Sequence, residues 1–311
     1  MRKIIVHNPC NEHTRYYRNY NLFWDELTDE LKKKYEVTEN RYYELANQQR
    51  FKVNLKNQTS CDDCFLLLEC EYVIEFEDTG EIYIMSVSDD LSHATLNEKN
   101  NPLVKKVLIS QFLREKIESY VGPDLMDKYS PWIYFPFNID DLESFYEKRK
   151  TIHQFIDKMY FRGTSIPDRP IVTHFNTDYL NGYGLIGGPT TYFEDLIKYK
   201  IGLSIAGRGE LCYRDIEYMA LGIPMIRFNY LSELNPNLIP NYHYISINRP
   251  DDLIIDRLGN ESHAKLIEER YLEVKDDYEF LNFISKNARQ YYTDYLSREN
   301  RVNHTIKLLN L

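Results

Sequence analysis

Short apolar runs and helical patterns alternate along much of the chain, and they predict an α/β protein. Ile4–Val6 is short and β-branched, which is typical of a buried first strand. Apolar residues between Tyr20 and Tyr35 recur at helical spacing, so an amphipathic helix is expected there, and residues 36–44 could form the next strand. A strand, a helix and a second strand in this order open many nucleotide-binding α/β lobes.

The rest of the first half contains further strand patterns. Apolar runs predict strands at 65–68, 72–76, 82–87, 107–110 and 132–137, with a helix at 112–120. Asp-Thr-Gly at 78–80 is a hairpin signal between two of these strands. A polar stretch of helical period at 138–157 contains the expected boundary between two lobes, which are assigned to 1–145 and 146–311.

In the second half, strand and helix patterns alternate at the spacing of a parallel sheet. The expected strands are 158–163, 201–205, 223–227 and 244–247, and the expected helices are 190–200, 213–221, 261–273 and 278–296. Gly222 is expected to cap the helix at 213–221. The fold class is therefore α/β, with an N-terminal α/β lobe and a C-terminal α/β lobe that has closing helices.

Composition and charge exclude some partners. Hydrophobic residues make up 43% of the 311, enough to build a packed core. The formal net charge of −10 disfavours nucleic acid as a partner, because backbone affinity comes from basic side chains. No apolar stretch approaches the roughly 18 residues of a membrane span. The N-terminal apolar run is too short for a secretion signal, so a cytoplasmic location is expected.

Cysteine and acidic residues give no metal motif. The five cysteines are odd in number, and without a secretion signal they are expected to stay reduced. Cys61 and Cys64 form a CxxC pair that lacks a fourth zinc ligand at suitable spacing. No Asp-x-Asp follows a strand, so neither a metal nor a cofactor is expected.

Residues 200–226 carry the chemistry that the sequence suggests. They are predicted to form a strand, a glycine-rich loop, a helix, a tight turn and a strand. Gly207 and Gly209 would let the backbone approach a ligand closely. The N-terminus of the following helix favours an anion such as a diphosphate, and Arg208 and Arg214 would add donors suited to phosphate oxygens.

Acidic and aromatic residues complete this candidate site. Tyr213 begins the helix, and Glu210 and Glu217 lie seven residues apart, on roughly one helical face. Glu217 could accept hydrogen bonds from the hydroxyls of a ribose. The alternative is a structural role in which Arg214 and Glu217 form a surface pair one turn apart.

The residues from Glu210 to Ile226 resemble the donor-binding segment of GT-B glycosyltransferases. In that segment one acidic residue lies on a helix that ends in a motif like Ala-Leu-Gly-Ile-Pro-Met-Ile. The resemblance implies two Rossmann-like lobes with a cleft between them. It also implies that Glu217 binds the ribose and that Gly207–Glu210 form the phosphate loop. Phe161-Arg162-Gly163 resembles a strand end of exostosin-like and CAP10-like members, which makes Arg162 a second phosphate-binding candidate or a structural arginine.

The family resemblance implies transfer of a sugar from a nucleoside diphosphate sugar to a hydroxyl of a glycan or glycoprotein, without a metal. An inverting reaction needs a general base in the first lobe, and Asp90 and His93 follow an expected strand there. His7 and His13 are rival candidates, and a retaining reaction requires no such base. A nucleotide-sugar isomerase of the same shape and a non-catalytic glycan-binding module remain alternatives.

Overall fold

The computed structural model describes the protein in eleven stretches. They are residues 1–10, 18–43, 50–53, 65–68, 71–87, 101–134, 139–162, 170–181, 189–206, 210–250 and 261–311. The chain divides into two compact units. The first unit contains 1–138, 232–235 and 301–311, and the second contains 139–231 and 236–300. The division thus falls seven residues before the expected one at 145/146, and the last eleven residues return to the first unit.

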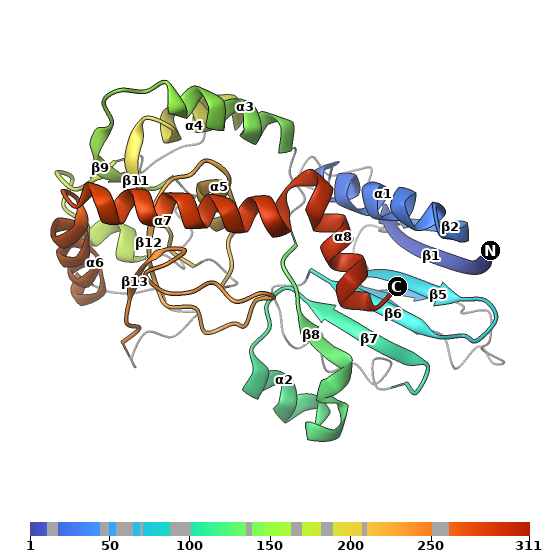
Figure 1. The fold of residues 1–311 in the computed structure, drawn as a ribbon. Coiled ribbons are helices and arrows are strands. Elements are labelled where there is room, and N and C mark those ends of the chain that lie inside the picture. The colour runs from blue at the N-terminus through green and yellow to red at the C-terminus, as the bar shows by residue number, and fades with distance from the viewer. Residues whose placement is uncertain are drawn as a thin grey trace. The chain divides into compact units, whose positions relative to one another are not determined.

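A six-stranded mixed sheet forms the centre of the first unit (Figure 1). Its order is β2 (Tyr35–Tyr43), β1 (Arg2–Cys10), β5 (Glu71–Phe76), β6 (Ile82–Ser86), β7 (Val104–Ile109) and β8 (Tyr129–Pro131). β5 runs antiparallel to both β1 and β6, while the other neighbours are parallel. The predicted opening β-α-β unit and the predicted hairpin are both confirmed.

Helices cover both faces of this sheet. α1 (Arg18–Lys32) packs on β1 and β2, and its Trp24 stacks on Tyr72 of β5 with ring centroids 4.8 Å apart. Val73, the next residue of β5, points to the other face because side chains alternate along a strand. There it joins a core that includes Ile117 of α2 (Arg114–Val121). The 3₁₀ helix η4 (Pro123–Lys128) follows α2.

Three parts of the first unit differ from the sequence prediction. The strand expected at 65–68 is confirmed as β4 (Phe65–Leu68), but it pairs with the unexpected β3 (Arg50–Val53) in a separate two-stranded sheet. No strand lies at 132–134, the described part of the strand expected at 132–137, and the edge strand is instead β8, which pairs with β7. A last helix, α8 (Arg298–Leu309), was not expected. Its Thr305 accepts a hydrogen bond from the indole of Trp132 at 2.9 Å.

The second unit contains the all-parallel sheet that the sequence predicts. Its order is β10 (Leu180–Asn181), β9 (Ile156–Tyr160), β11 (Tyr199–Leu203), β12 (Met225–Phe228) and β13 (Ile245–Ile247). Its helices are α3 (Ile139–Lys150), η5 (Pro170–His174), α4 (Pro189–Leu196), α5 (Tyr213–Ala220), α6 (Glu261–Val274) and α7 (Tyr278–Tyr291), which continues into a π-helical turn at Tyr292–Leu296.

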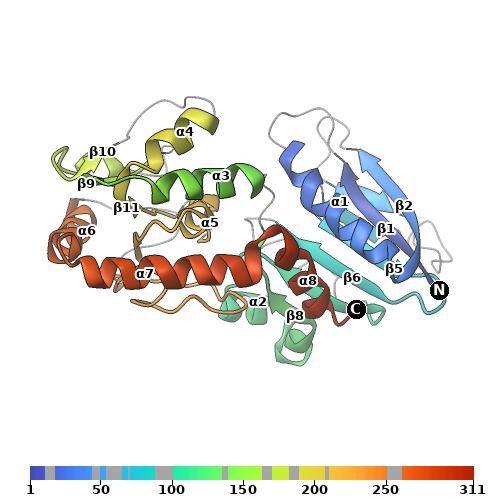
Figure 2. The same ribbon diagram turned by 45° about the horizontal axis from the view of Figure 1, so that its top comes forward.

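The two faces of β11 are covered by different helices. Ile201 and Leu203 point to the face covered by α6 and α7, where they join Ile267 and Ile284 in one core. Gly202 points to the opposite face, toward Tyr218 of α5. α5 lies between α3 and α7 in both views (Figures 1 and 2).

The carboxyl end of α5 is fixed by both neighbouring helices. Arg289 of α7 donates to the carbonyl of Ala220 and forms an ion pair with Glu143 of α3 at 2.5 Å. Gly222 follows with φ +60, a conformation that glycine adopts without strain, and Ser285 of α7 donates to its carbonyl at 2.6 Å. These contacts hold the helix in place, so its first turn has a defined position at the edge of the sheet.

We predict that Gly202→Ala lowers the free energy of unfolding by about 1–3 kcal/mol, the usual range for an overpacked core. A Cβ at Gly202 would lie 2.7 Å from the ring of Tyr218. The ring cannot easily move, because its hydroxyl donates to the carbonyls of Tyr160 and Leu203. Chemical denaturation measures the change.

The matched controls are the same substitution in the Tyr218→Phe and Tyr218→Ala backgrounds. The penalty should become smaller with phenylalanine, which keeps the ring but lacks the hydroxyl that holds it in place, and should largely disappear with alanine, which removes the ring. A change below about 0.5 kcal/mol, as at an ordinary surface site, would show that the contact of Gly202 with Tyr218 is not tight.

Candidate functional site

The candidate site lies at the carboxyl edge of the parallel sheet, around the start of α5. β11 ends at Leu203 and α5 begins at Tyr213, so the connection between them crosses this edge. Ligands of open α/β sheets bind outside the carboxyl ends of the strands. Gly207, Arg208 and Gly209 lie outside the described residues.

Asp215 connects the start of α5 to the neighbouring strands. Its side chain is fully buried and accepts a hydrogen bond from the backbone N–H of Cys212, the cap residue, at 3.0 Å. It also accepts hydrogen bonds from the hydroxyls of Ser204, just after β11, and Tyr230, just after β12. Arg227 of β12 completes the set with an ion pair at 2.5 Å. One carboxylate therefore holds both ends of the β11–α5 connection against β12.

Glu210 is fixed in a similar way. Its carboxylate oxygens accept hydrogen bonds from Nη2 of Arg249 at 2.8 and 2.9 Å, and Arg227 lies 3.6 Å away. The backbone N–H of Leu231 donates to it at 3.3 Å. The sequence assigned Glu210 to a phosphate loop, but these contacts engage the carboxylate within the protein.

We refer to Glu210, Asp215, Arg227 and Arg249 as the buried ion cluster. Two carboxylates face two guanidinium groups, so the cluster carries no net charge. Burial acts to lower the pKa of Arg227, but Asp215 and Glu210 offset that effect and the pKa is raised. Arg227 therefore stays charged, with its guanidinium stacked 3.2 Å above the ring centre of Tyr230. Removing one member of the cluster would leave a buried charge without its partner, which is strongly destabilising.

A second group of side chains lies around Arg214 and Glu217. Nη2 of Arg214 donates to the carbonyl of Arg162 at 2.9 Å, and its guanidinium lies 4.4 Å from the ring centre of Phe161. The other two nitrogens, Nε and Nη1, are buried without a hydrogen-bond partner. Tyr192 of α4 donates to Glu217 at 2.7 Å. We call these five residues the Arg214–Glu217 site.

Buried donors without partners are uncommon, because losing water without a replacement costs about 1–3 kcal/mol per group. Arg214 has two such nitrogens. Glu217 is only 9% exposed, and its burial raises the pKa of the carboxyl group, while the Tyr192 hydroxyl and Arg214 partly counteract the rise. A ligand that offers hydrogen-bond acceptors to Arg214 and donors to Glu217 would therefore stabilise both side chains.

The predicted site residues fall into four sets. Arg162, Arg214 and Glu217 come together in the Arg214–Glu217 site, where Arg162 also lies 3.7 Å from Asp195. Glu210 belongs to the buried ion cluster, and Tyr213 is the half-buried first residue of α5. Outside the described residues lie Asp90, His93, Gly207, Arg208 and Gly209.

His7, a rival candidate for a base in the first unit, has a structural environment. It is 1% exposed, with Nε2 3.4 Å from Glu75 and Nδ1 3.1 Å from the amide of Asn40. Both ring nitrogens are therefore engaged by side chains of the neighbouring strands β5 and β2. His13, the other rival, lies outside the described residues.

Sequence reasoning missed several residues of the site. Asp215 had a signal, because an acid three residues after a helix cap is the capping-box pattern. Arg227 is a lone arginine in the apolar run 225–228, which suggests a buried partner. Tyr192 and Arg249 had no comparable signal, since each meets its partner only through the arrangement of α4, α5 and the strand ends.

Searches for other kinds of site gave negative results within the described stretches. No group of three or more His, Cys, Asp or Glu side chains there is arranged to hold a metal ion. Of the helices described, none is both long and apolar enough to cross a membrane.

We predict that Arg227→Met lowers the free energy of unfolding by about 3–5 kcal/mol, since it leaves Asp215 and Glu210 buried without their shared cation. The control is Lys198→Met in the same unit. Lys198 is 53% exposed and pairs with Asp195 at 3.1 Å, so its loss should change stability by about 0–1 kcal/mol. Urea denaturation measures the free energy of unfolding of both variants. Equal losses would contradict the claim that the buried ion cluster stabilises the second unit.

We predict that Glu217→Gln makes the protein more stable than the wild type near pH 8. Because folding raises the pKa of Glu217 above its ordinary 4.5, this carboxyl group favours the folded state most below pH 4.5. That contribution is lost as the pH rises through the raised pKa. The advantage of the uncharged variant should therefore shrink as the pH falls toward 4.

Denaturation of both proteins from pH 4 to 8 checks this dependence. Glu118→Gln, at an exposed position of α2, is the control and should show no such trend. A Glu217→Gln variant that is less stable than the wild type at pH 8 would mean that the charged carboxylate is well compensated in the folded state.

Among the solved structures to which this chain is similar are two that come from Rickettsia and Anabaena. No protein-family model matches the sequence, and no curated protein sequence matches it. A glycosyltransferase from Rickettsia africae ESF-5 aligns with a TM-score of 0.43 and 16% identity, over 71% of this chain and 67% of that one. Anabaena Alr3699/HepE, in complex with UDP-glucose, aligns with a TM-score of 0.41 and 10% identity, over 69% of this chain and 66% of that one.

Proposed function

We propose that this chain is a glycosyltransferase that binds a nucleoside diphosphate sugar at the carboxyl edge of its second sheet. The observation that carries the proposal is Arg214, whose Nε and Nη1 are buried without partners beside the first turn of α5. Guanidinium groups are well suited to phosphate oxygens, and the N-terminus of a helix adds further donors and a favourable dipole. A diphosphate would satisfy both nitrogens.

Glu217 is proposed to bind the ribose of the donor. It lies one helical turn after Arg214, so a diphosphate on Arg214 would leave the ribose within reach of its carboxylate. The carboxylate can accept about four hydrogen bonds, and Tyr192 supplies one. The ribose hydroxyls would supply others and compensate for the burial that raises the pKa of Glu217.

The proposed reaction breaks the bond between the sugar carbon and the diphosphate oxygen and forms a bond from that carbon to an acceptor hydroxyl. The leaving diphosphate gains negative charge, which Arg214 and the helix N-terminus would stabilise without a metal. Gly207, Arg208, Gly209 and Arg162 are proposed to assist on sequence grounds. If the reaction inverts, Asp90 or His93 is proposed to take the proton of a glycan or glycoprotein hydroxyl.

We expect one of the nucleoside diphosphates UDP, TDP, GDP or CDP to raise the thermal midpoint of unfolding, with or without Mg²⁺. At a hundred times its dissociation constant, a ligand stabilises by about 2.7 kcal/mol. Arg214→Gln should weaken binding about ten- to a hundredfold, since a hydrogen bond to a charged group contributes about 1.5–3 kcal/mol. Lys150→Met, which removes an exposed lysine of α3 that pairs with Glu147, should bind as the wild type does.

Each result decides a part of the proposal. Stabilisation that requires Mg²⁺ would remove the metal-independent mechanism but keep the donor site. Stabilisation that is unaffected by Arg214→Gln would move the nucleotide to another place on the protein. If none of the nucleotides stabilises the chain, the glycosyltransferase proposal fails.

A further inference from the structure

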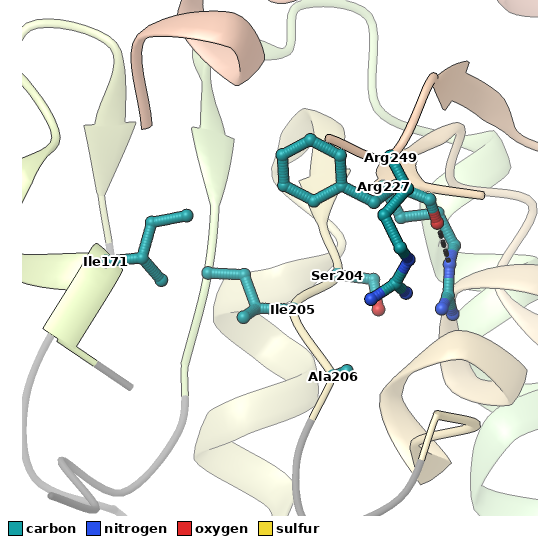
Figure 3. A pocket seen from close by; sticks show the side chains of 7 residues that line it. Ile171, Ser204, Ile205, Ala206, Arg227 and Arg249 are labelled. Carbon is teal, nitrogen blue, oxygen red and sulfur yellow. Dashed lines mark hydrogen bonds between the residues drawn. The ribbon is translucent and has the colours of Figure 1, made fainter. Parts of the chain in front are cut away.

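A small cavity lies at the carboxyl ends of β11 and β12, next to the buried ion cluster (Figure 3). Its volume is about 20 Å³, room for one or two groups the size of a water molecule. Its lining residues are Ile171, Ser204, Ile205, Ala206, Arg227, Phe228 and Arg249. In Figure 3 the two arginines lie at one end of the cavity, and Ile171 and Ile205 lie at the other.

Arg249 brings an unused donor to this cavity. Its Nη2 donates to Glu210 and to the carbonyl of Asn229, and its Nε donates to the same carbonyl. Nη1 is buried and has no hydrogen-bond partner. The side chain is only 10% exposed, so bulk water does not readily replace the missing partner. A ligand atom that accepts a hydrogen bond would satisfy Nη1.

The charges around the cavity favour an uncharged acceptor. Arg249 is neutralised by Glu210, which lies 2.8 Å away, and Arg227 is neutralised by Asp215 at 2.5 Å. A phosphate oxygen placed here would approach two buried carboxylates and be repelled by them. A carbonyl oxygen accepts a hydrogen bond equally well and brings no charge.

Apart from Ser204, whose hydroxyl already donates to Asp215, the remaining walls favour a flat apolar group. Ile171, Ile205, Ala206 and the ring of Phe228 offer no charged or hydroxyl group to a ligand. The volume is too small for a whole aromatic ring, so the cavity would take only the edge of one. An uncharged ring with a carbonyl oxygen on its edge fits both the walls and the unused donor.

The donor nucleotide of the proposed function contains such a ring, and the inference rests on that function. We propose that Nη1 of Arg249 donates to the carbonyl at position 4 of uracil or thymine, or at position 6 of guanine, in the donor's nucleobase, so that the site selects these bases. Cytosine and adenine carry an amino group where uracil and guanine carry this carbonyl. An amino group at that position is itself a hydrogen-bond donor, so it would repel the N–H of Nη1 and leave Nη1 without a partner.

The test compares UDP with CDP, which differ at position 4 of the base, and GDP with ADP, which differ at position 6 and also in the 2-amino group of guanine. Calorimetric titration of the wild type should show a preference of about ten- to a hundredfold for the carbonyl member of one pair, corresponding to about 1–3 kcal/mol per base contact. Arg249→Lys keeps a positive charge for Glu210 but removes the guanidinium. This variant should bind the two members of each nucleotide pair with nearly equal affinity.

Two controls keep the result interpretable. Lys150→Met should keep the wild-type preference, and the thermal midpoint of Arg249→Lys shows whether that variant folds. If it does not fold, the two nucleotide pairs with the wild type decide alone. Equal affinity within both pairs, or a preference that survives in folded Arg249→Lys, would overturn the inference while leaving the donor site intact. Absence of binding by every nucleotide would instead overturn the proposed function and this inference with it.

Discussion

The second unit depends on a buried set of opposite charges that joins three strand ends to one helix. Asp215 and Glu210 follow β11, Arg227 lies in β12, and Arg249 follows β13. Taking four charges out of water is unfavourable, and their mutual contacts compensate only when each partner is in place. The cluster therefore ties these segments together, because moving any one of them would leave a buried charge without its partner. The first turn of α5 is held in place from this side, and its carboxyl end is held by α3 and α7.

This rigid arrangement allows the opposite side of α5 to remain incompletely satisfied. Arg214 keeps two buried nitrogens without partners, and Glu217 is held by Tyr192 in surroundings that raise its pKa. Such features destabilise a protein in the absence of a ligand, and they are typical of sites where function opposes stability. The same holds for Nη1 of Arg249 beside its cavity. Three unsatisfied donors around one sheet edge suggest a single ligand with several acceptor groups, and a nucleoside diphosphate provides phosphate oxygens and a base carbonyl.

Local patterns in the sequence predicted most of the fold. The alternation of apolar runs and helices in the second half gave the parallel sheet, and the hairpin between β5 and β6 followed from its turn residues. Arg214, Glu217 and Arg162 could be proposed because each belongs to a short motif near a strand end or a helix start. Arg249 and Tyr192 could not, because their roles arise from contacts between segments 39 and 25 residues apart. Glu210 looked like a ligand-binding acid for the same reason, since nothing local shows that Arg227 and Arg249 engage it. Helix α8 and its packing in the first unit were not predicted either, because charged and polar residues separate its few apolar ones.

A crystal structure of the chain with a bound nucleoside diphosphate tests the central claim most directly. The account predicts phosphate oxygens within about 3.2 Å of Nε or Nη1 of Arg214, next to the first turn of α5. It also predicts that the buried ion cluster keeps the same pairs in the complex. A nucleotide bound elsewhere, with both nitrogens of Arg214 still without partners, would contradict it.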